Sequence, residues 1–240
     1  EVAFGMKEGM MLSLTYGKKA VIDRVQQGLR GPMLNVYRAP TDNDWRSSER
    51  VGQKWLSAGL AKLNRLVKDF QVERVSLFQA KVITSVYYHS SEKSGFDHRC
   101  TYTILVNGCI KVENDVKPFG ELPILPKIGV QMTLRGEFSN FQWYGRGPHE
   151  NYPDRKTGAA IGHYQSEVSK QYVPYVRPQE NGNKEDVRWV AFLDSAGEGL
   201  MVVADDVLSV TALHYTAADL AQAAHIHELR PRRDVIVCLD

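Results

Sequence analysis

The sequence predicts an all-β protein, built as a large antiparallel sandwich with one or two short helices. Most segments of the 240-residue chain alternate apolar and polar side chains with a period of two, which is typical of strands with one buried face. Turn signals such as Asn107-Gly108, Pro118-Phe119-Gly120 and Ser195-Ala196-Gly197 separate these segments at short intervals. The short intervals favour hairpins and leave no room for repeated βαβ crossovers, so two sheets packed face to face are expected.

The strands expected from this alternation are residues 11–16, 81–89, 99–106, 109–116, 128–134, 187–193, 200–204, 207–213 and 235–239. We find no internal repeat of about 20 to 50 residues and no low-complexity linker that would divide the chain. Residues 1–240 are therefore expected to form one large domain.

Two helices are expected between the strands. The first starts after Ser48 and carries an apolar face of Val51, Trp55 and Ala58, with an extension to Leu63 and Leu66 left open. The second begins at Thr216, which forms a variant of the capping box with Asp219, and runs towards His227.

The three cysteines do not form a pattern that predicts a disulfide or a metal site. Cys100 and Cys109 flank Asn107-Gly108, which signals a two-residue type I′ hairpin in which Val106 faces Cys109. Cys100 then lies too far along its strand to reach Cys109, and no ligand spacing suits zinc. Buried free thiols are expected.

Composition excludes several classes of protein. The 30 basic and 28 acidic residues give a net charge of +2 and are dispersed along the chain, so nucleic acid is not an expected partner. No apolar run approaches the roughly 20 residues that span a bilayer, and the start does not resemble a signal peptide. We expect a soluble protein, with the bacterial cytoplasm and periplasm both open. Because the chain begins without Met, we also expect it to be cut from a longer protein.

One turn-rich segment, residues 143–155, combines aromatic rings, glycines, two prolines and forked donors. Flat rings cover the apolar face of a pyranose and paired polar groups bond its hydroxyls, so this mixture suits a sugar site. The candidates here are Arg146, Glu150, Asn151, Tyr152 and Arg155. The alternative is a structural elbow in which the two arginines bond backbone carbonyls and local carboxylates.

Two further segments have the same character and each follows an expected strand. Residues 172–184 contribute the candidates Gln179, Glu180 and Asn181, and residues 38–46 contribute Asp42, Asn43, Asp44, Trp45 and Arg46. A calcium loop starting at Asp42 lacks the Gly and the Glu that such a loop requires at its sixth and twelfth positions. We expect the Asn and Asp residues to turn the chain there.

Three histidines near the end of the chain invite a metal site, namely His214, His225 and His227. On a helix, His225 and His227 would point about 200° apart, whereas a helical chelate needs a spacing of three or four residues. We therefore expect no metal site, and histidines that bond the backbone at a helix C-terminus.

Together these segments resemble the small-chain domain, the C-terminal sandwich, of lacZ-type β-galactosidases in glycoside hydrolase family 2. The resemblance rests on motifs that follow the family's order over about residues 10–240: Arg38-Ala39-Pro40-Thr41-Asp42-Asn43-Asp44, Leu125-Pro126-Lys127-Ile128-Gly129, Trp143-Tyr144-Gly145-Arg146-Gly147-Pro148, Glu150-Asn151-Tyr152-Pro153-Asp154-Arg155-Lys156-Thr157-Gly158, Tyr175-Val176-Arg177-Pro178-Gln179-Glu180-Asn181-Gly182 and His225-Ile226-His227-Glu228-Leu229.

The resemblance implies a galactose-mutarotase-like supersandwich and an enzyme whose chemistry lies outside this chain. Family members hydrolyse terminal β-D-galactosides of the lactose type with retention, using two glutamates about 5 Å apart on a separate (β/α)₈ barrel. No catalytic residue is assigned to this chain, and no cofactor to this domain, whereas Mg and Na or K are expected in other domains. The implied partners are the barrel, further sandwich domains and, in a homo-oligomer, further copies of the whole enzyme.

The resemblance also implies two routes by which this domain reaches the active site. One is a loop that follows Asp42-Asn43-Asp44 and here begins near Trp45 and Arg46. The other is a Trp in a Gly-Gly-Asp-Asp-Ser-Trp stretch that should follow Asp240, so the chain is expected to be truncated.

Three hypotheses follow. In the first, the chain completes the aglycone side of a barrel's site and binds galactose or a β-galactoside weakly, with the candidates above and His214 facing sugar. In the second, it only supports the barrel and the oligomer. In the third, it is an aldose 1-epimerase with His214 as acid and Glu180 as base.

Overall fold

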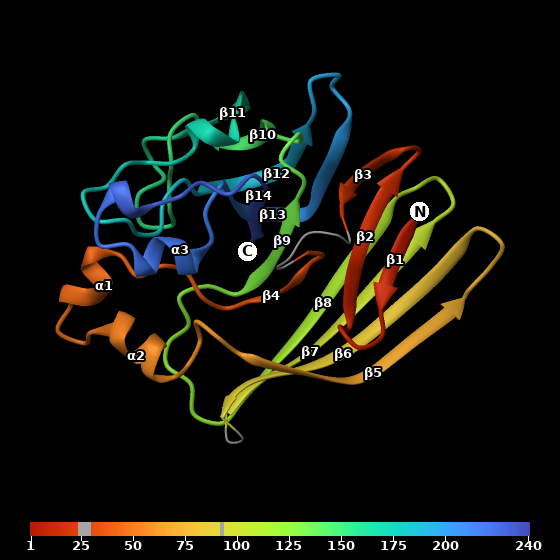
Figure 1. Ribbon diagram of the computed structural model, residues 1–240, viewed down its shortest axis with the longest axis horizontal. Coiled ribbons are helices and arrows are strands. Elements are labelled where there is room, and N and C mark those ends of the chain that lie inside the picture. The colour runs from red at the N-terminus through yellow and green to blue at the C-terminus, as the bar shows by residue number, and fades with distance from the viewer. Residues whose placement is uncertain (24–29, 92–93) are drawn as a thin grey trace.

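The computed structural model describes residues 1–23, 30–91 and 94–240, which form three antiparallel sheets and short helices (Figure 1). The first sheet has the order β1-β2-β3 and consists of β1 (Val2–Gly5), β2 (Met10–Tyr16) and β3 (Lys19–Ile22). The second is a meander of four longer strands, β5 (Asn64–Arg74), β6 (Gln79–Ser91), β7 (Ser94–Leu105) and β8 (Ile110–Phe119).

The third sheet has seven strands and joins distant parts of the chain. Its spatial order is β11-β10-β12-β13-β14-β9-β4, so β9 lies between the last strand and an early one. The strands are β4 (Met33–Asn35), β9 (Gly129–Leu134), β10 (Asn140–Gly147), β11 (Ala160–Glu167), β12 (Lys184–Leu193), β13 (Gly199–Leu213) and β14 (Val235–Leu239).

One apolar core is shared by all three sheets. Buried side chains of the three-stranded sheet, such as Met11, and of the four-stranded sheet, such as Tyr102, pack with Trp143, Phe192 and Val237 of the seven-stranded sheet. Burial of large apolar side chains between facing sheets is what stabilises a sandwich. The predicted all-β sandwich is therefore confirmed.

The α-helices lie together on one side of the seven-stranded sheet (Figure 1). They are α1 (Asp42–Arg46), α2 (Val51–Ser57) and α3 (Ala217–Gln222), and two 3₁₀ turns are present, η1 (Val168–Lys170) and η2 (Ile226–Glu228). None of the helices in the described ranges is long and apolar enough to cross a membrane.

Both predicted helices exist but are shorter than expected. The first, α2, ends at Ser57, and Leu66 lies in strand β5, so the extension was wrong. The second, α3, has the predicted capping box between Thr216 and Asp219 but ends at Gln222, because Ala223 is already extended. The chain therefore passes His225 and His227 outside any α-helix.

The hairpin between β7 and β8 also differs from its prediction. Ile104 pairs with Ile110, the amide of Leu105 donates to the carbonyl of Cys109 at 2.9 Å, and Gly108 has a φ of 89°. This is a three-residue loop that ends in a left-handed glycine, not a two-residue type I′ turn, and Leu105 rather than Val106 faces Cys109. All three cysteines are free, as predicted, but Cys109 is exposed and Cys238 is half-buried, so the expected burial was right for Cys100 and wrong for Cys109.

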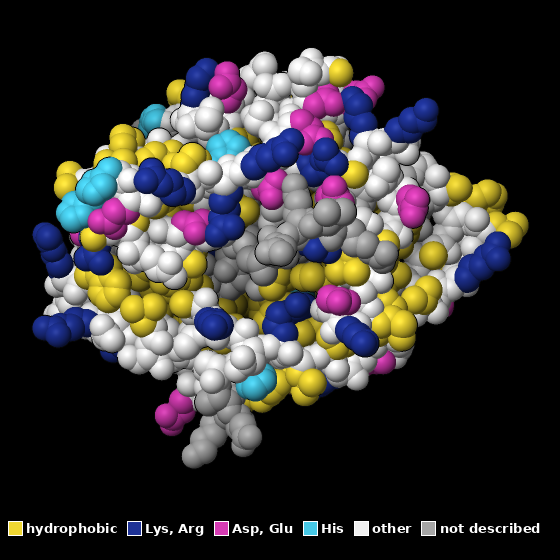
Figure 2. Space-filling model, viewed as in Figure 1, with side chains coloured by type: hydrophobic (Ala, Val, Ile, Leu, Met, Phe, Trp, Pro, Cys, Tyr) yellow, Lys and Arg dark blue, Asp and Glu magenta, His cyan; other side chains and the backbone are white. Residues whose placement is uncertain are grey.

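Several strands escaped the sequence pattern. Strands β1, β3 and β4 have at most four residues, β5 is largely exposed on both faces, and β10 and β11 contain glycines that interrupt the alternation. Residues 200–204 and 207–213 form one continuous strand, β13. Charge is distributed as expected: on the face drawn in Figure 2, Lys and Arg side chains are interspersed with Asp and Glu.

Candidate functional site

Three segments that carry predicted site residues meet at one end of the seven-stranded sheet. They are α1, residues 148–158 between β10 and β11, and residues 171–183 before β12, and we call them the loop assembly. Backbone bonds join them: the amide of Asn151 donates to the carbonyl of Asn183 at 2.9 Å, and the amide of Glu180 donates to the carbonyl of Ala39 at 3.3 Å. The sequence motifs therefore build one continuous structure.

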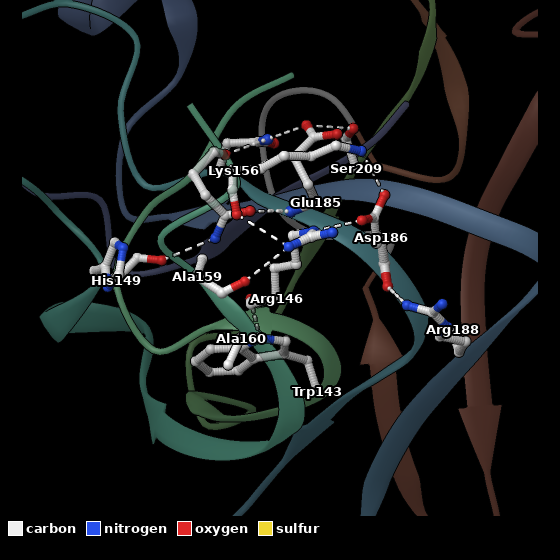
Figure 3. A network of polar contacts seen from close by, with 12 residues as sticks. Trp143, Arg146, His149, Lys156, Ala159, Ala160, Glu185, Asp186, Arg188 and Ser209 are labelled. Carbon is white, nitrogen blue, oxygen red and sulfur yellow. Dashed lines mark hydrogen bonds and ion pairs between the residues drawn. The ribbon is translucent and has the colours of Figure 1, made fainter. Parts of the chain in front are cut away.

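Arg146 holds the base of this assembly (Figure 3). Its Nε donates to Oδ2 of Asp186 at 2.5 Å, and its Nη1 donates to the carbonyls of Lys156 and Ala159 at 3.0 and 2.9 Å. The guanidinium is half-buried and three of its bonds stay within the protein. This geometry corresponds to the structural elbow that the sequence left open as an alternative.

Asp186 pairs with Arg146, and the sequence analysis did not include it among the candidate site residues. It also accepts a bond from Nζ of Lys156 at 2.9 Å, and its φ is 53°, in the left-handed region. The bonds from Lys156 and Arg146 hold the pKa of the Asp186 carboxyl below its usual value. No local pattern marks Asp186, because its partners lie at least 30 residues away in the sequence.

The glycines of strand β10 are required by close packing. A Cβ on Gly145 would lie 2.8 Å from the Cα of Val187, and one on Gly147 would lie 2.9 Å from the rings of Trp143 and Tyr164. The indole Nε1 of Trp143 donates to the carbonyl of Arg146 at 2.9 Å. The Gly147-Pro148 peptide bond is cis. The motif around Arg146 is thus explained by packing and backbone bonding.

Asn151 is fully buried and joins the loop to the sheet. Its Oδ1 accepts from the amide of Glu185 at 2.8 Å, and its Nδ2 donates to the carbonyl of His149 at 3.0 Å. The neighbouring amide Nδ2 of Asn183 donates to the carbonyl of Asn151 at 2.9 Å. Ser209 on β13 completes the network by donating to the Glu185 carboxylate at 2.7 Å. Asn151 therefore holds residues 148–158 against β12.

Glu150 connects the two long loops. Its Oε1 accepts from Nη2 of Arg155 at 2.8 Å and from the hydroxyl of Tyr175, while its Oε2 accepts from the amide of Gly182 at 2.7 Å. Gly182 has a φ of 82°, which favours glycine. The Arg155 guanidinium lies over the ring of Tyr152, 4.8 Å from its centroid. Both carboxylate oxygens of Glu150 are thus used within the protein.

Gln179 and Asn181 also bond inward. Oε1 of Gln179 accepts from the amide of Asp42 at 3.0 Å, which attaches α1 to the second long loop. Oδ1 of Asn181 accepts from the amide of Val173 at 3.0 Å, and its Nδ2 donates to the carbonyl of Gln179 at 2.9 Å. These side chains take the place of regular secondary structure in satisfying the loop backbone.

Helix α1 replaces the turn expected at Asp42-Asn43-Asp44. Its N-cap Thr41 and the carboxylate of Asp44 form a capping box, and Asp44 also binds the Arg38 guanidinium at 2.6 and 3.2 Å. Burial would raise the pKa of Asp44, but Arg38 and Thr41 outweigh it and the pKa is lowered. Trp45 is half-buried beneath Arg177, whereas Asn43 and Arg46 are exposed.

A group of buried polar atoms lies behind the loop assembly. The pKa of Glu180 is raised by burial, although the charges of Lys127 and Arg38 oppose this. Lys127 pairs with Oδ2 of Asp240 at 2.6 Å. Among the residues that the structure describes, the buried hydroxyl of Tyr152 and the buried Oδ1 of Asp240 have no hydrogen-bond partner. Most buried polar atoms in proteins are hydrogen-bonded, so a water molecule or a ligand hydroxyl that bonded Tyr152 or Asp240 would stabilise this region.

His214 directly follows β13, and its Nδ1 is 3.0 Å from the carbonyl of Asp234. The predicted bond to backbone is present, but the predicted position at a helix C-terminus was wrong. For His225 and His227 the helical argument was wrong. They flank Ile226 at the 3₁₀ turn η2, and their rings stack with centroids 5.3 Å apart and planes at 16°. The two rings therefore lie on the same side of the chain.

The fold and the loop assembly define a β-sandwich in which three polar segments are joined by backbone hydrogen bonds at one end of the seven-stranded sheet. Compared with known families, the model for "Beta galactosidase small chain" matches residues 1–240, and the chain belongs to that family. It is 33% identical over 98% of its length to a β-galactosidase of Priestia megaterium, 32% over 95% to one of Halalkalibacterium halodurans, and 33% over 95% to one of Lactobacillus delbrueckii subsp. bulgaricus. In each case the match spans 22% of the relative, so the relatives contain much more protein than this chain.

Proposed function

We propose that this chain is a non-catalytic part of a β-galactosidase, and that α1 on its loop assembly helps to complete a β-galactoside site formed mainly by another part of the larger protein. The relatives are named β-galactosidases and are much longer than this chain. Their length supports the proposal that catalysis takes place in another part of the larger protein. Hydrolysis with retention needs two carboxyl groups about 5 Å apart, and we place that pair outside these 240 residues.

One observation carries the proposal: α1 is hydrogen-bonded to the loop assembly on its inner side and exposes side chains on its outer side. Gln179 bonds its first amide and Arg38 binds Asp44, so its backbone position is set by the loop assembly. Asn43 and Arg46 are exposed, which leaves an amide and a guanidinium available to a ligand, and the half-buried ring of Trp45 offers the part of its surface that Arg177 does not cover. A rigidly held group loses little entropy when it binds, and this supports a role in positioning substrate.

The interior of the loop assembly enters this proposal as support for α1. Arg146, Asn151, Asn181 and Glu150 hold the loops, and they act on sugar through the position they give to α1. Mg and Na or K ions, where the larger protein uses them, belong to its other parts. The chain alone is expected to bind galactose weakly, because part of a site makes few contacts.

The test is kinetic and uses the complete natural protein that carries this chain. Replacing Asn43 or Trp45 by Ala should raise KM for a chromogenic β-galactoside about three- to tenfold, the loss of one neutral hydrogen bond or one ring contact. Asn107→Ala, on the exposed β7–β8 loop, is the matched control and should leave KM unchanged. Unchanged KM in both α1 variants would contradict the sugar-site role, and turnover by the purified 240-residue chain would contradict the non-catalytic one.

A second candidate function, contact between copies of the larger protein, is favoured by the far end of the four-stranded sheet. Val72, Leu77, Phe78 and Val106 line a groove there and are 66 to 77% exposed, and we call this surface the apolar tip. Clustered exposed apolar side chains mark interaction sites. Changing Leu77 and Phe78 to Ser in the complete protein should weaken its assembly in analytical ultracentrifugation, and unaltered assembly would remove this function.

A further inference from the structure

A cluster of potential metal ligands lies outside the loop assembly, at the 3₁₀ turn η2. One ligand atom each from His225, His227 and Glu228 lies within 4.8 Å of the other two, and all three residues are exposed. In Figure 2, histidine side chains appear at the surface on the side where Figure 1 draws α3. No other feature of the proposed function uses these side chains.

The turn explains why His225 and Glu228 converge, while His225 itself is the extended residue that precedes the turn. The amide of Glu228 donates to the carbonyl of His225 at 3.1 Å, and residues three apart eclipse one another in such a turn. Nδ1 of His225 consequently lies 2.9 Å from Oε1 of Glu228. The ring of His227 then stacks on that of His225. On an α-helix, the rings of His225 and His227 would point about 200° apart.

A backbone hydrogen bond also orients the carboxylate of Glu228. Oε2 of Glu228 accepts from the amide of Ala224 at 2.8 Å, which leaves Oε1 directed at His225. Such a supporting bond is typical of carboxylates that bind metals. A proton now bridges Oε1 and Nδ1, and a metal ion can replace it as the electron-pair acceptor between the same two atoms.

We propose that His225, His227 and Glu228 bind one Zn²⁺ ion, with water as the fourth ligand. Two imidazoles and one carboxylate match the borderline softness of Zn²⁺, whereas Mg²⁺ prefers oxygen ligands alone. Tetrahedral bonds of about 2.1 Å require donor atoms about 3.4 Å apart, so the exposed side chains must close in by little more than 1 Å. The nearby Arg232 guanidinium is paired with the carboxylate of Asp219.

Isothermal titration of the complete natural protein with ZnCl₂ tests this site. The expected result is one equivalent of Zn²⁺ per chain, bound with a micromolar Kd, that His227→Ala weakens at least tenfold. In the described part of the chain the His227 ring stacks on His225 and makes no hydrogen bond, so this variant should keep its fold, which circular dichroism checks. His149→Ala, an exposed histidine away from the cluster, is the matched control.

The outcome is read as a difference between variants, so other metal sites in the larger protein do not obscure it. An equivalent that is lost in His227→Ala, weakened in Glu228→Gln and retained in His149→Ala supports the site. Equal stoichiometry and affinity in the wild type and His227→Ala overturn it, as does displacement of the bound Zn²⁺ by equimolar Mg²⁺. The result does not depend on sugar binding by α1.

Discussion

The loop assembly and the apolar tip lie at different ends of the molecule and differ in how their side chains are used. In the loop assembly, Arg146, Glu150 and Asn151 look reactive in the sequence but bond the protein itself. At the apolar tip, Leu77 and Phe78 belong to no motif that the sequence singled out, but they are exposed between β5 and β6. The polar motifs of the loop assembly thus form hydrogen bonds within the protein, whereas the surface available to a partner consists of exposed apolar side chains.

The first way to break this comparison is to remove the packing beneath the loop assembly. Trp143 is 1% exposed, stacks on Phe141 and Tyr164 and donates to the Arg146 carbonyl. Trp143→Ala should lower the free energy of unfolding of the chain by about 3–5 kcal/mol, because it leaves a cavity and a lost bond. Urea denaturation followed by circular dichroism measures this, and a loss below about 1 kcal/mol would contradict the assigned packing.

The same denaturation experiment tests the domain prediction. Since one core joins all three sheets, the wild-type chain should unfold in a single transition at the same urea concentration by fluorescence and by circular dichroism. Two separated transitions would show that residues 1–240 contain more than one folding unit.

The second prediction concerns the Arg146 bonds. Arg146→Met keeps most of the apolar stem but deprives Asp186 and the carbonyls of Lys156 and Ala159 of a partner. We expect a loss of about 2–3 kcal/mol in unfolding free energy, since half-buried polar groups are left unsatisfied. If Arg146 faced ligand instead, the same change would weaken sugar binding and leave stability within about 0.5 kcal/mol of the wild type.

The third prediction is a pH dependence at Asp186. Because its pKa is lowered in the folded protein, the stability it contributes is present above the unfolded value of about 3.9 and is lost as pH falls through the folded value. Asp186→Asn, which tolerates the positive φ, should cost about 1–2 kcal/mol at pH 7. The difference from wild type should shrink towards zero between about pH 5 and pH 2. A constant difference over this range would exclude the ion pairs as its cause.

The smallest effect on stability is expected at the apolar tip. Phe78→Ser should change the unfolding free energy of the chain by no more than about 0.5 kcal/mol, since the ring is 66% exposed and its removal opens no cavity. A large loss in the isolated chain would mean that the tip is part of the core and would end its contrast with the loop assembly.

The sequence predicted the class of fold better than its details. Alternation located β7, in which buried side chains recur along the strand, and it also located β9 and β14, whose side chains are buried on both faces. It missed β5, whose side chains are mostly exposed, and β10, whose glycines fit against Val187 and Tyr164. Those glycines are dictated by neighbours distant in sequence, which a local pattern does not contain.

The candidate site shows the same limit. The motifs correctly singled out residues that meet in one place, but they did not tell which side chains face inward, because this depends on partners such as Asp186 and Ala39. At His225 and His227, the error came from assuming an α-helix where a 3₁₀ turn follows an extended residue. Whether the outward side chains of α1 meet sugar stays a prediction.

The strand order of the seven-stranded sheet has a consequence for how the chain acquires its structure. Within the described ranges, each of the strands β5 to β8 pairs with its neighbours in sequence, so this meander can assemble early, while the chain is still being synthesised. In contrast, β9 pairs with β4, and Leu134 must wait for Val235, about a hundred residues further on. We therefore expect an interval during translation in which the four-stranded meander has formed and the seven-stranded sheet has not. During this interval the apolar face of the meander would be exposed and could bind a chaperone.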